Sequence, residues 1–264
     1  MKKEVKLIKK VKRLLKRLNC SRYLHHFGPK KYAFYQHIFA LLVKIISRRS
    51  FRRVCKFLEL FDIEVPTYSA LCKMRKRILP KLWDAILQAT VNFESYIVAV
   101  DSTGFSRTNP SWYYIKRIDR KKPVKSYVKL SSFFDTRRKK FLALKVRARP
   151  RHDIKDIPSL LRQRSNFKKL VGDSAYDAES LHEQAFDLGI KTIIKPKKNA
   201  RKGFYRRKQR EHYRKRTYGR RNMQESGFGS LKRKYGSFLL ARRFSTQKAE
   251  LYCAAIAHNL GLRF

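Results

Sequence analysis

The sequence predicts an α/β protein in which a mixed sheet flanked by helices follows an all-α N-terminal region. Up to residue 94, apolar residues recur with helical spacing. From Tyr96 onwards the pattern changes to short runs rich in β-branched residues, which alternate with helical segments. The order strand, hairpin, helix, strand, helix, strand, helix is typical of an α/β fold. We therefore expect a helical region over residues 1–94 and a second domain over residues 95–264.

The charge of the chain indicates its partner. Its 264 residues include 66 Lys and Arg against 19 Asp and Glu, a net charge of +47, while 43% are hydrophobic. Such a charge favours nucleic acid, because binding releases the counterions condensed on phosphates. An acidic membrane surface is the competing partner. The longest apolar run, from Phe39, contains Lys44 and is too short to span a bilayer, so we expect no membrane segment.

The first residues indicate where the protein is located, and the cysteines indicate whether it contains a zinc site or disulfides. Lysines are interspersed where a signal peptide needs an apolar run, so we expect a cytoplasmic, nucleoid-associated protein. The four cysteines form no C-x2-C pair, which argues against a zinc ribbon and against a disulfide scaffold. We expect them to act as small buried apolar residues.

The first hundred residues predict a series of helices. Residues 4–18 form an amphipathic pattern that could pack on the body of the protein or lie on DNA. Residues 32–46 have a wide apolar face and should form a buried helix. Ser50 and Thr67 are each suited to cap a helix, and the stretch between those two helices breaks the pattern.

The second of these two helices is strongly basic. Its outward residues include Lys73, Arg75 and Lys76. Two short helices joined by a turn resemble a helix-turn-helix, whose second helix could enter a major groove. A plain helical hairpin has the same pattern, and both interpretations stay open.

Two acids follow buried strands in the second domain. The run YIVAV ends directly on Asp101, and a later short strand ends on Asp173. An uncompensated carboxylate there is costly unless it is paired or binds a metal, although Asp101 could also cap a turn. Active sites of such sheets lie beyond strand ends, so these two acids and a third on a later helix could converge.

Other polar residues near the strands have simpler explanations. Asp135 could be an accessory ligand, but a turn is the better account. His152-Asp153 could touch the site or form a local turn, and His182 should pack or face water. Asp177 and Glu179 occupy positions where a first helical turn favours negative charge.

A third acid lies on a basic and aromatic helix face. Tyr218, Arg221, Glu225 and Lys232 would fall within an arc of roughly 60° on a helix, at about 100° per residue. A carboxylate repels DNA phosphates but can hold a divalent metal against them. Gly227 and Gly229 weaken this helix by about 1 kcal/mol each relative to alanine, or mark a close backbone approach.

The segment before this helix, residues 195–217, is strongly basic. It could be a solvated loop or a clamp for a DNA strand, with Phe204, Tyr205 and Tyr213 available to stack on bases. The last helix should be capped near Ser245 or Thr246 and pack against the sheet or the preceding helix.

Three motifs together carry a family resemblance. They occur in the order VAVDSTGF, VGDSAYD and Tyr218-x2-Arg221-x3-Glu225-x6-Lys232. This set resembles the DDE transposases of insertion sequences, in the group with the Y-R-E-K signature. The likeness covers about residues 96–264, and the helical hairpin before it also looks like the N-terminal DNA-binding region of these proteins.

The resemblance implies a ribonuclease H-like domain in which Asp101, Asp173 and Glu225 bind two Mg²⁺ or Mn²⁺ ions. It implies that Tyr218, Arg221 and Lys232 contact DNA near the transposon end. The implied activity is metal-dependent cleavage at the element's terminal inverted repeats and strand transfer into target DNA, by at least a homodimer. The short gap between Asp173 and Glu225 indicates that the large β insertion of some relatives is absent.

Three rival functions remain at the level of the sequence. A non-catalytic DNA-binding protein derived from a transposase would need the charge alone. A tyrosine recombinase using Tyr218 would need a cluster of arginines and histidines around it. An RNA-binding or ribosomal-type protein explains the charge but not three acids at strand and helix positions.

Overall fold

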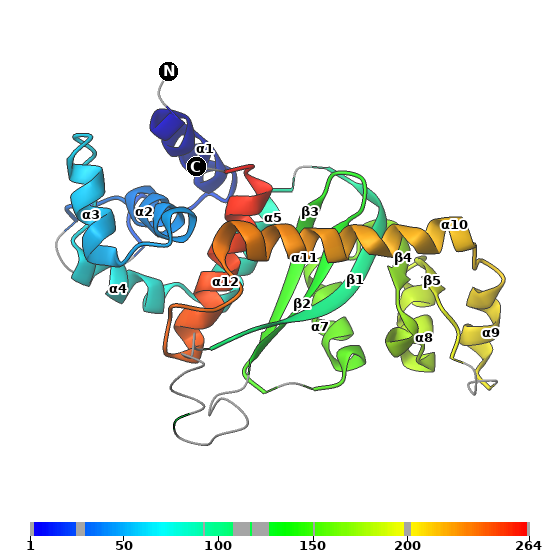
Figure 1. The fold of residues 1–264 in the computed structure, drawn as a ribbon. Coiled ribbons are helices and arrows are strands. Elements are labelled where there is room, and N and C mark those ends of the chain that lie inside the picture. Colours follow the sequence, from blue (N-terminus) through cyan, green and yellow to red (C-terminus); the bar gives the residue numbers. More distant parts are fainter. Residues whose placement is uncertain are drawn as a thin grey trace. The chain divides into compact units, whose positions relative to one another are not determined.

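The computed structural model describes residues 3–24, 30–91, 93–107, 117, 127–149, 151–197 and 202–262, whose contacts divide the chain into two compact units (Figure 1). The first unit comprises Met1–Asn92, Lys234–Gly236 and Arg243–Phe264, and the second comprises Phe93–Arg233 and Ser237–Arg242. The predicted fold class, a mixed sheet flanked by helices and preceded by a helical region, is confirmed.

The first unit is helical. Its helices are α1 (Lys3–Arg17), α2 (Phe34–Ser47), α3 (Phe51–Glu59), α4 (Tyr68–Arg77), α5 (Pro80–Ala89) and α12 (Phe244–Asn259). The buried α2 lies against α1, α3, α4 and α12. The amphipathic α1 therefore packs on the body of this unit, with Val11 and Leu14 buried.

The C-terminal helix α12 belongs to this first unit, whereas the sequence placed it in the domain expected over residues 95–264. It packs against α2 and α5, and the Asn259 amide donates to Thr90 Oγ1 at 2.7 Å. It begins after Arg243 without a side-chain cap, so the predicted cap at Ser245 or Thr246 is wrong. Its residues are buried on nearly all sides, which favours a position between helices over one on a sheet face.

The predicted caps of α3 and α4 are confirmed. The backbone N–H of Arg53 donates to Ser50 Oγ at 3.3 Å, and that of Ala70 donates to Thr67 Oγ1 at 3.4 Å. All four cysteines are free, and Cys55 and Cys253 are buried as expected. No helix among the described residues is long and apolar enough to cross a membrane.

The second unit is built on a five-stranded sheet in the order β3-β2-β1-β4-β5. The strands are β1 (Ser95–Phe105), β2 (Val128–Asp135), β3 (Lys140–Arg147), β4 (Phe167–Gly172) and β5 (Lys191–Ile194). β1 pairs antiparallel with β2 and parallel with β4, so the sheet is mixed. The hairpin β2–β3 and the later strands lie where the sequence predicted them.

Between the strands of this unit lie the helices η1 (Asp153–Asp156), α7 (Ile157–Gln163), η2 (Ser174–Tyr176) and α8 (Glu179–Asp187). After β5 follow α9 (Phe204–Arg210), α10 (Lys215–Tyr218), η3 (Gly219–Arg221) and α11 (Asn222–Tyr235), whose last two residues belong to the first unit. The basic segment 195–217 thus contains two helices rather than a loop, and its residues 198–201 lie outside the described part. Figure 1 shows α11 running across one face of the sheet.

The two glycines of α11 differ in surroundings. A Cβ on Gly227 would lie 2.7 Å from Cζ of Phe134, a ring buried in the sheet. A Cβ on Gly229 would instead meet the flexible end of the Arg233 side chain, at 3.1 Å from Nη1. Gly227 therefore marks a close approach of the helix backbone to the sheet, and the helix continues through both glycines.

We predict opposite effects of alanine at these two positions. Gly229→Ala should raise the free energy of unfolding by up to about 1 kcal/mol, the helix-propensity gain. Gly227→Ala should lower it by up to about 2 kcal/mol, because overpacking costs about 1–3 kcal/mol and exceeds that gain. Urea unfolding measures both. Equal stabilisation by the two variants would contradict the close approach.

Candidate active site on the carboxyl edge of the sheet

Asp101 lies within β1 rather than at its end. The parallel pairing of β1 with β4 stops at Ala99, which faces Val171, whereas the antiparallel pairing with β2 continues to Phe105. β1 is therefore longer than the sequence predicted, because β2 extends it. Asp101 still comes just beyond the parallel part of the sheet, at the edge where the carboxyl ends of parallel strands meet.

Asp173 follows β4 directly at the same edge. It caps the short helix η2, with the Ala175 N–H donating to its Oδ1 at 2.9 Å. Asp101 accepts a similar bond from the Ser102 N–H at 2.8 Å. Each carboxylate is thus held by a neighbouring backbone group.

Glu225 approaches from the helix. Its carboxylate is half-exposed and pairs with Arg221 Nη2 at 3.0 Å. The guanidinium carbon of Arg221 lies 5.9 Å from the centre of the Tyr218 ring, which lies 5.7 Å from the Tyr213 ring. Tyr218, Arg221 and Glu225 therefore share one side of the run from α10 through η3 into α11, as their spacing predicted.

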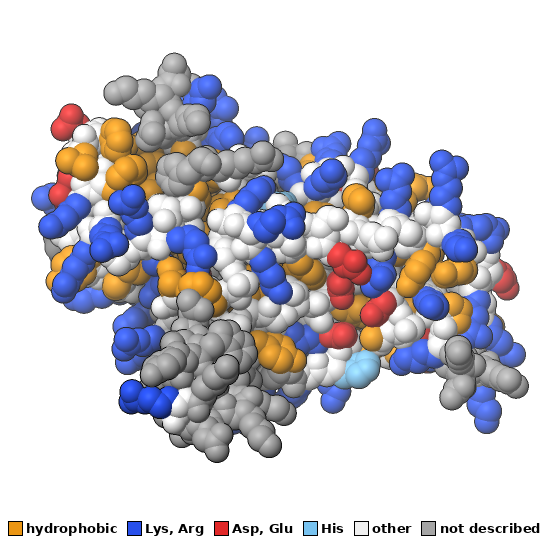
Figure 2. Space-filling model, viewed as in Figure 1, with side chains coloured by type: hydrophobic (Ala, Val, Ile, Leu, Met, Phe, Trp, Pro, Cys, Tyr) orange, Lys and Arg blue, Asp and Glu red, His pale blue; other side chains and the backbone are white. Residues whose placement is uncertain are grey.

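Asp173 and Glu225 both act electrostatically on Asp101. Burial raises the pKa of Asp101 to about 6, and repulsion from Asp173 and Glu225 adds to this rise. The Ser102 N–H and Arg221 oppose it. Figure 2 shows acidic side chains gathered on this face of the second unit, with Lys and Arg side chains around them. The structure thus brings Asp101, Asp173 and Glu225 to one region.

Lys232 lies two helical turns beyond Glu225 and points to β1. Its ammonium donates to Thr103 Oγ1 at 2.8 Å and lies 5.3 Å from the centre of the Phe105 ring. Burial lowers the pKa of this lysine. Lys232 therefore lies beside the strand that carries Asp101.

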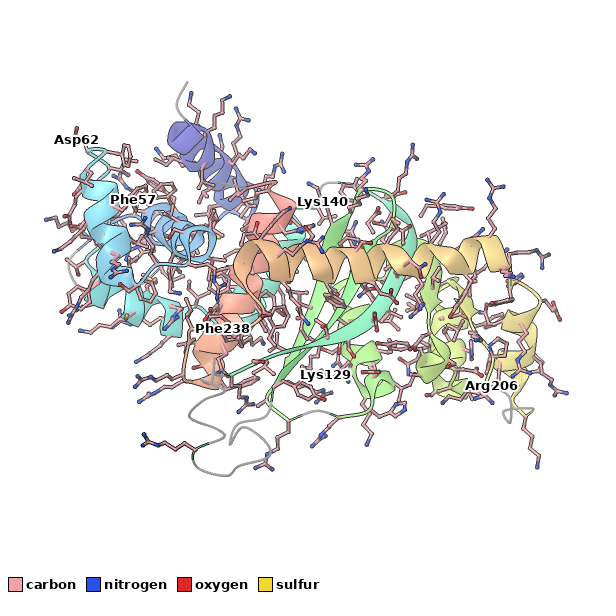
Figure 3. The ribbon with its side chains drawn as sticks, viewed as in Figure 1. Phe57, Asp62, Lys129, Lys140, Arg206 and Phe238 are labelled. Atoms are coloured by element: carbon pink, nitrogen blue, oxygen red, sulfur yellow. The ribbon has the colours of Figure 1, made fainter. Side chains whose placement is uncertain are left out.

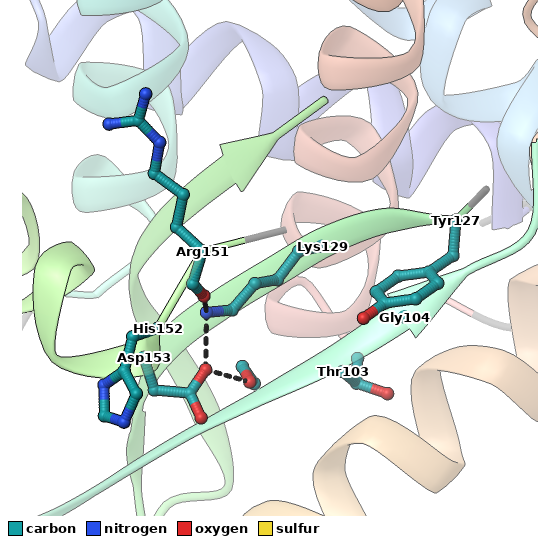
Figure 4. A pocket seen from close by; sticks show the side chains of 8 residues that line it. Thr103, Gly104, Tyr127, Lys129, Arg151, His152 and Asp153 are labelled. Carbon is teal, nitrogen blue, oxygen red and sulfur yellow. Dashed lines mark hydrogen bonds and ion pairs between the residues drawn. The ribbon is translucent and has the colours of Figure 1, made fainter. Parts of the chain in front are cut away.

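A group of hydrogen-bonded polar residues, Ser102, Asp153 and Lys129, begins at the residue after Asp101. In the sequence, the pair His152-Asp153 was the only and weak indication of this group. Asp153 Oδ1 accepts from Ser102 Oγ at 2.7 Å and pairs with the buried Lys129 at 2.5 Å, as Figure 4 shows. His152 caps the helix η1. A hollow of about 470 Å³ opens here, lined by residues of β1 and β2 and by residues 151–153.

Gln224 is a site residue that sequence reasoning missed. Its side chain is fully buried, and its amide nitrogen donates to the backbone oxygens of Asp101 and Ser132. The signal was a polar residue on the buried stripe of the helix, one turn before Gly227 and two before Leu231. Tyr176, also missed, is buried nearby, and burial together with Asp153, Asp101 and Asp173 raises its pKa.

The remaining candidate acids have structural roles. Asp135 is buried and accepts from the backbone N–H groups of Arg137 and Arg138, so it holds the β2–β3 turn. Asp177 is buried among hydrogen bonds from His182, the Lys197 N–H and Arg206, a residue labelled in Figure 3. These hydrogen bonds hold the pKa of Asp177 below its ordinary value, although burial alone would raise it.

Glu179 caps a helix other than its own. It accepts from the backbone N–H groups of Tyr205 and Arg206 at the start of α9. The Tyr205 ring packs against Phe186 at 5.3 Å, while Phe204 remains exposed. The basic segment is therefore anchored to α8 by acidic residues.

The residues proposed to read DNA lie on α4 in the first unit. Lys73 and Lys76 are exposed, whereas Arg75 is partly buried with its guanidinium carbon 5.0 Å from the centre of the Phe51 ring. Lys73 and Lys76 thus project into solvent.

The donor chemistry suits a hard cation. In the part of the chain that the structure describes, no three Asp, Glu, His or Cys side chains are gathered as a closed set of metal ligands. Two further acids, Asp173 and Glu225, nevertheless lie close enough to Asp101 to act on its carboxylate electrostatically. All three offer carboxylate oxygens, the ligands that Mg²⁺ and Mn²⁺ prefer. The repulsion that raises the Asp101 pKa is the kind that a bound cation relieves.

Comparisons with known proteins give one family match and several distant structural likenesses. Residues 92–260 match the family described as "Transposase DDE domain". A piggyBac transposase synaptic complex with hairpin DNA is 10% identical, with a TM-score of 0.45, over 97% of this chain and 73% of that one. A Mos1 transposase paired-end complex is 12% identical, with a TM-score of 0.24, over 95% and 87%. No curated protein matches the sequence.

The family match covers the sheet, its three acids and the helix that carries Glu225. The chain belongs to the family of transposase DDE domains.

Proposed function

We propose that this transposase-family protein cleaves DNA strands at the ends of an insertion sequence and transfers them into target DNA. Asp101, Asp173 and Glu225 would hold two divalent cations, Mg²⁺ or Mn²⁺. The observation that carries this proposal is that the matched family domain contains Asp101 and Asp173 at the edge of the sheet and Glu225 on α11, close enough for both other acids to act electrostatically on Asp101. When bound, the cations would activate water or a 3′-hydroxyl and stabilise the leaving oxygen.

The chain's own residues would arrange the substrate around these acids. Arg221 neutralises Glu225 in the absence of DNA, and its guanidinium fork is suited to a phosphate. Lys232 would contact the backbone along β1, and Tyr218 offers a half-exposed ring beside Arg221. Joining two element ends implies at least a homodimer on DNA.

The helical region would supply part of the binding. With 66 Lys and Arg in the chain, phosphate contacts should dominate affinity. The capped α3–α4 pair fits a helix-turn-helix in which α4 enters a major groove. The second candidate function is a non-catalytic DNA-binding protein, which the charge would explain without the acids.

Loss of any of the three acids should separate cleavage from binding. We expect each of three substitutions, Asp101→Asn, Asp173→Asn and Glu225→Gln, to reduce Mg²⁺-dependent cleavage by more than about 100-fold. Loss of a residue that only supports a metal ligand costs up to about 100-fold, and loss of a ligand itself should cost more. DNA affinity should persist, because the basic surface is unchanged. Gel assays with DNA carrying the element's ends measure both.

The matched control is Asp135→Asn, which changes a buried acid that holds a turn and should retain cleavage. Wild-type protein that binds these ends without nicking them in Mg²⁺ or Mn²⁺ would support the non-catalytic function instead.

The Asp101 carboxylate should also make metal-free stability depend on pH. Its pKa rises from 3.8 to about 6 on folding, so its ionised form opposes folding above pH 6. Asp101→Asn should therefore stabilise the protein at pH 8 by up to about 3 kcal/mol, given about 1.4 kcal/mol per pKa unit. The gain should disappear as the pH falls through 6 towards 4.

Urea unfolding in EDTA at several pH values measures this effect. Glu183→Gln, on the exposed surface of α8, is the control and should change stability little at any pH. An Asp101→Asn variant no more stable than wild type at pH 8 would show that folding does not raise the pKa of Asp101.

The role of α4 can be tested by salt dependence. Lys73→Ala combined with Lys76→Ala should weaken DNA binding and lower the slope of log affinity against log salt by up to about 0.9 for each phosphate that the variant no longer neutralises. Lys168→Ala with Lys191→Ala removes the same charge from exposed positions on β4 and β5. Equal slopes for the two double variants would overturn the helix-turn-helix proposal.

A further inference from the structure

We infer that Gln224 is a positioning residue, whose buried amide ties α11 to β1 at Asp101 and so fixes where Glu225 stands relative to Asp101. This inference rests on the proposed function, because it concerns the same acids. Gln224 itself would touch neither a cation nor DNA.

The hydrogen bonds of the Gln224 amide join α11 to two neighbouring strands, β1 and β2. Gln224 Nε2 donates to Ser132 O at 2.8 Å, to Ser132 Oγ at 2.9 Å and to Asp101 O at 3.3 Å. Ser132 is the register partner of Asp101 across the β1–β2 pair. One side chain thus links the helix to both strands at the residue that carries the first acid.

The orientation of this amide follows from its partners. Carbonyl oxygens accept hydrogen bonds and cannot donate them, so the NH2 end must face Asp101 O and Ser132 O. Gln224 Oε1 is then buried without a hydrogen-bond partner among the described residues. The rest of this helix face is Gly227, Phe228 and Leu231, so packing alone would favour an apolar side chain here.

The position of Glu225 depends on this anchor, because it is the next residue on the helix. Its carboxylate is 52% exposed and pairs with Arg221 of the same helical run. In contrast, the Gln224 amide hydrogen-bonds to β1 and β2. These strands belong to the same sheet as β4, the strand that ends directly before Asp173. Acids on separate elements can share a cation only when the backbones that carry them are held at a fixed spacing.

A purely structural role is the alternative, and the chain contains a matched control. The Gln163 amide of α7 donates to Leu144 O at 3.0 Å and accepts from Leu144 N at 3.1 Å on β3. It likewise ties a helix to the sheet through backbone groups, yet it adjoins none of the three acids.

The test compares Gln224→Met with Gln163→Met in the full chain. Mn²⁺ binding to DNA-free protein is measured by calorimetry, and unfolding temperatures are measured in parallel. Gln224→Met should weaken Mn²⁺ binding by about 10-fold or more, as expected for residues behind a ligand set. It should also lower kcat for cleavage and leave KM for DNA unchanged. Gln163→Met should lower the unfolding temperature without either effect.

The outcomes are distinguishable. Wild-type Mn²⁺ binding that Asp101→Asn abolishes, together with equal affinities in both methionine variants, would overturn this inference and leave the proposed function standing. Wild-type protein that neither binds Mn²⁺ nor cleaves DNA would overturn both. If Gln224→Met fails to fold, Ser132→Ala removes one acceptor and should give a smaller loss of affinity in the same direction. Unchanged affinity in that variant would overturn the inference.

Discussion

The close approach of α11 to the sheet is the contact on which the candidate site depends. Gly227 brings the helix backbone against the ring of Phe134, and on the same face Phe228 packs near Phe141, with 6.0 Å between ring centres. A larger residue at position 227 would lift the helix and move Glu225 with it. Because the backbone of α11 lies this close to the sheet, the Lys232 side chain reaches Thr103 and the Gln224 side chain reaches the backbone oxygen of Asp101. A glycine that weakens the helix in isolation thus makes its docking possible.

Charge is distributed unevenly among the few acids of this basic chain. Asp156 pairs with Arg147, Asp153 with Lys129 and Asp177 with Arg206. Within the described residues no basic side chain pairs with Asp101 or Asp173, while Glu225 is held by Arg221. Burial and the repulsion from Asp173 and Glu225 both raise the pKa of Asp101, so the ionised form of this acid lowers the stability of the fold. A bound cation, as in the proposed function, would relieve this cost.

Much of the fold could be predicted from the sequence, because hydrophobic period and turn chemistry are local. Ser50 and Thr67 begin the helices they were expected to begin, and β2 and β3 lie at the predicted positions. The length of β1 could not be predicted, since its second half is stabilised by a partner strand distant in sequence. The position of α12 depended on long-range packing for the same reason.

The candidate site was predictable to the extent that it consists of acids in recognisable positions. Asp101, Asp173 and Glu225 stand out because carboxylates are unusual after strands and on a basic helix. The residues that hold them did not stand out. Gln224 and Ser102 are ordinary polar residues whose partners, such as Ser132 and Asp153, become neighbours through folding.

The course of the chain has a genetic consequence. The first unit needs both ends of the sequence, because α12 packs against α2 and α5 and the Lys10 ammonium of α1 donates to Leu260 O at 3.0 Å. A premature stop or frameshift shortly before residue 244 would leave the three acids encoded but strip α2 and α5 of a packing partner. Late truncations should therefore destabilise the helical unit while leaving the five strands and the three acids in the translated chain.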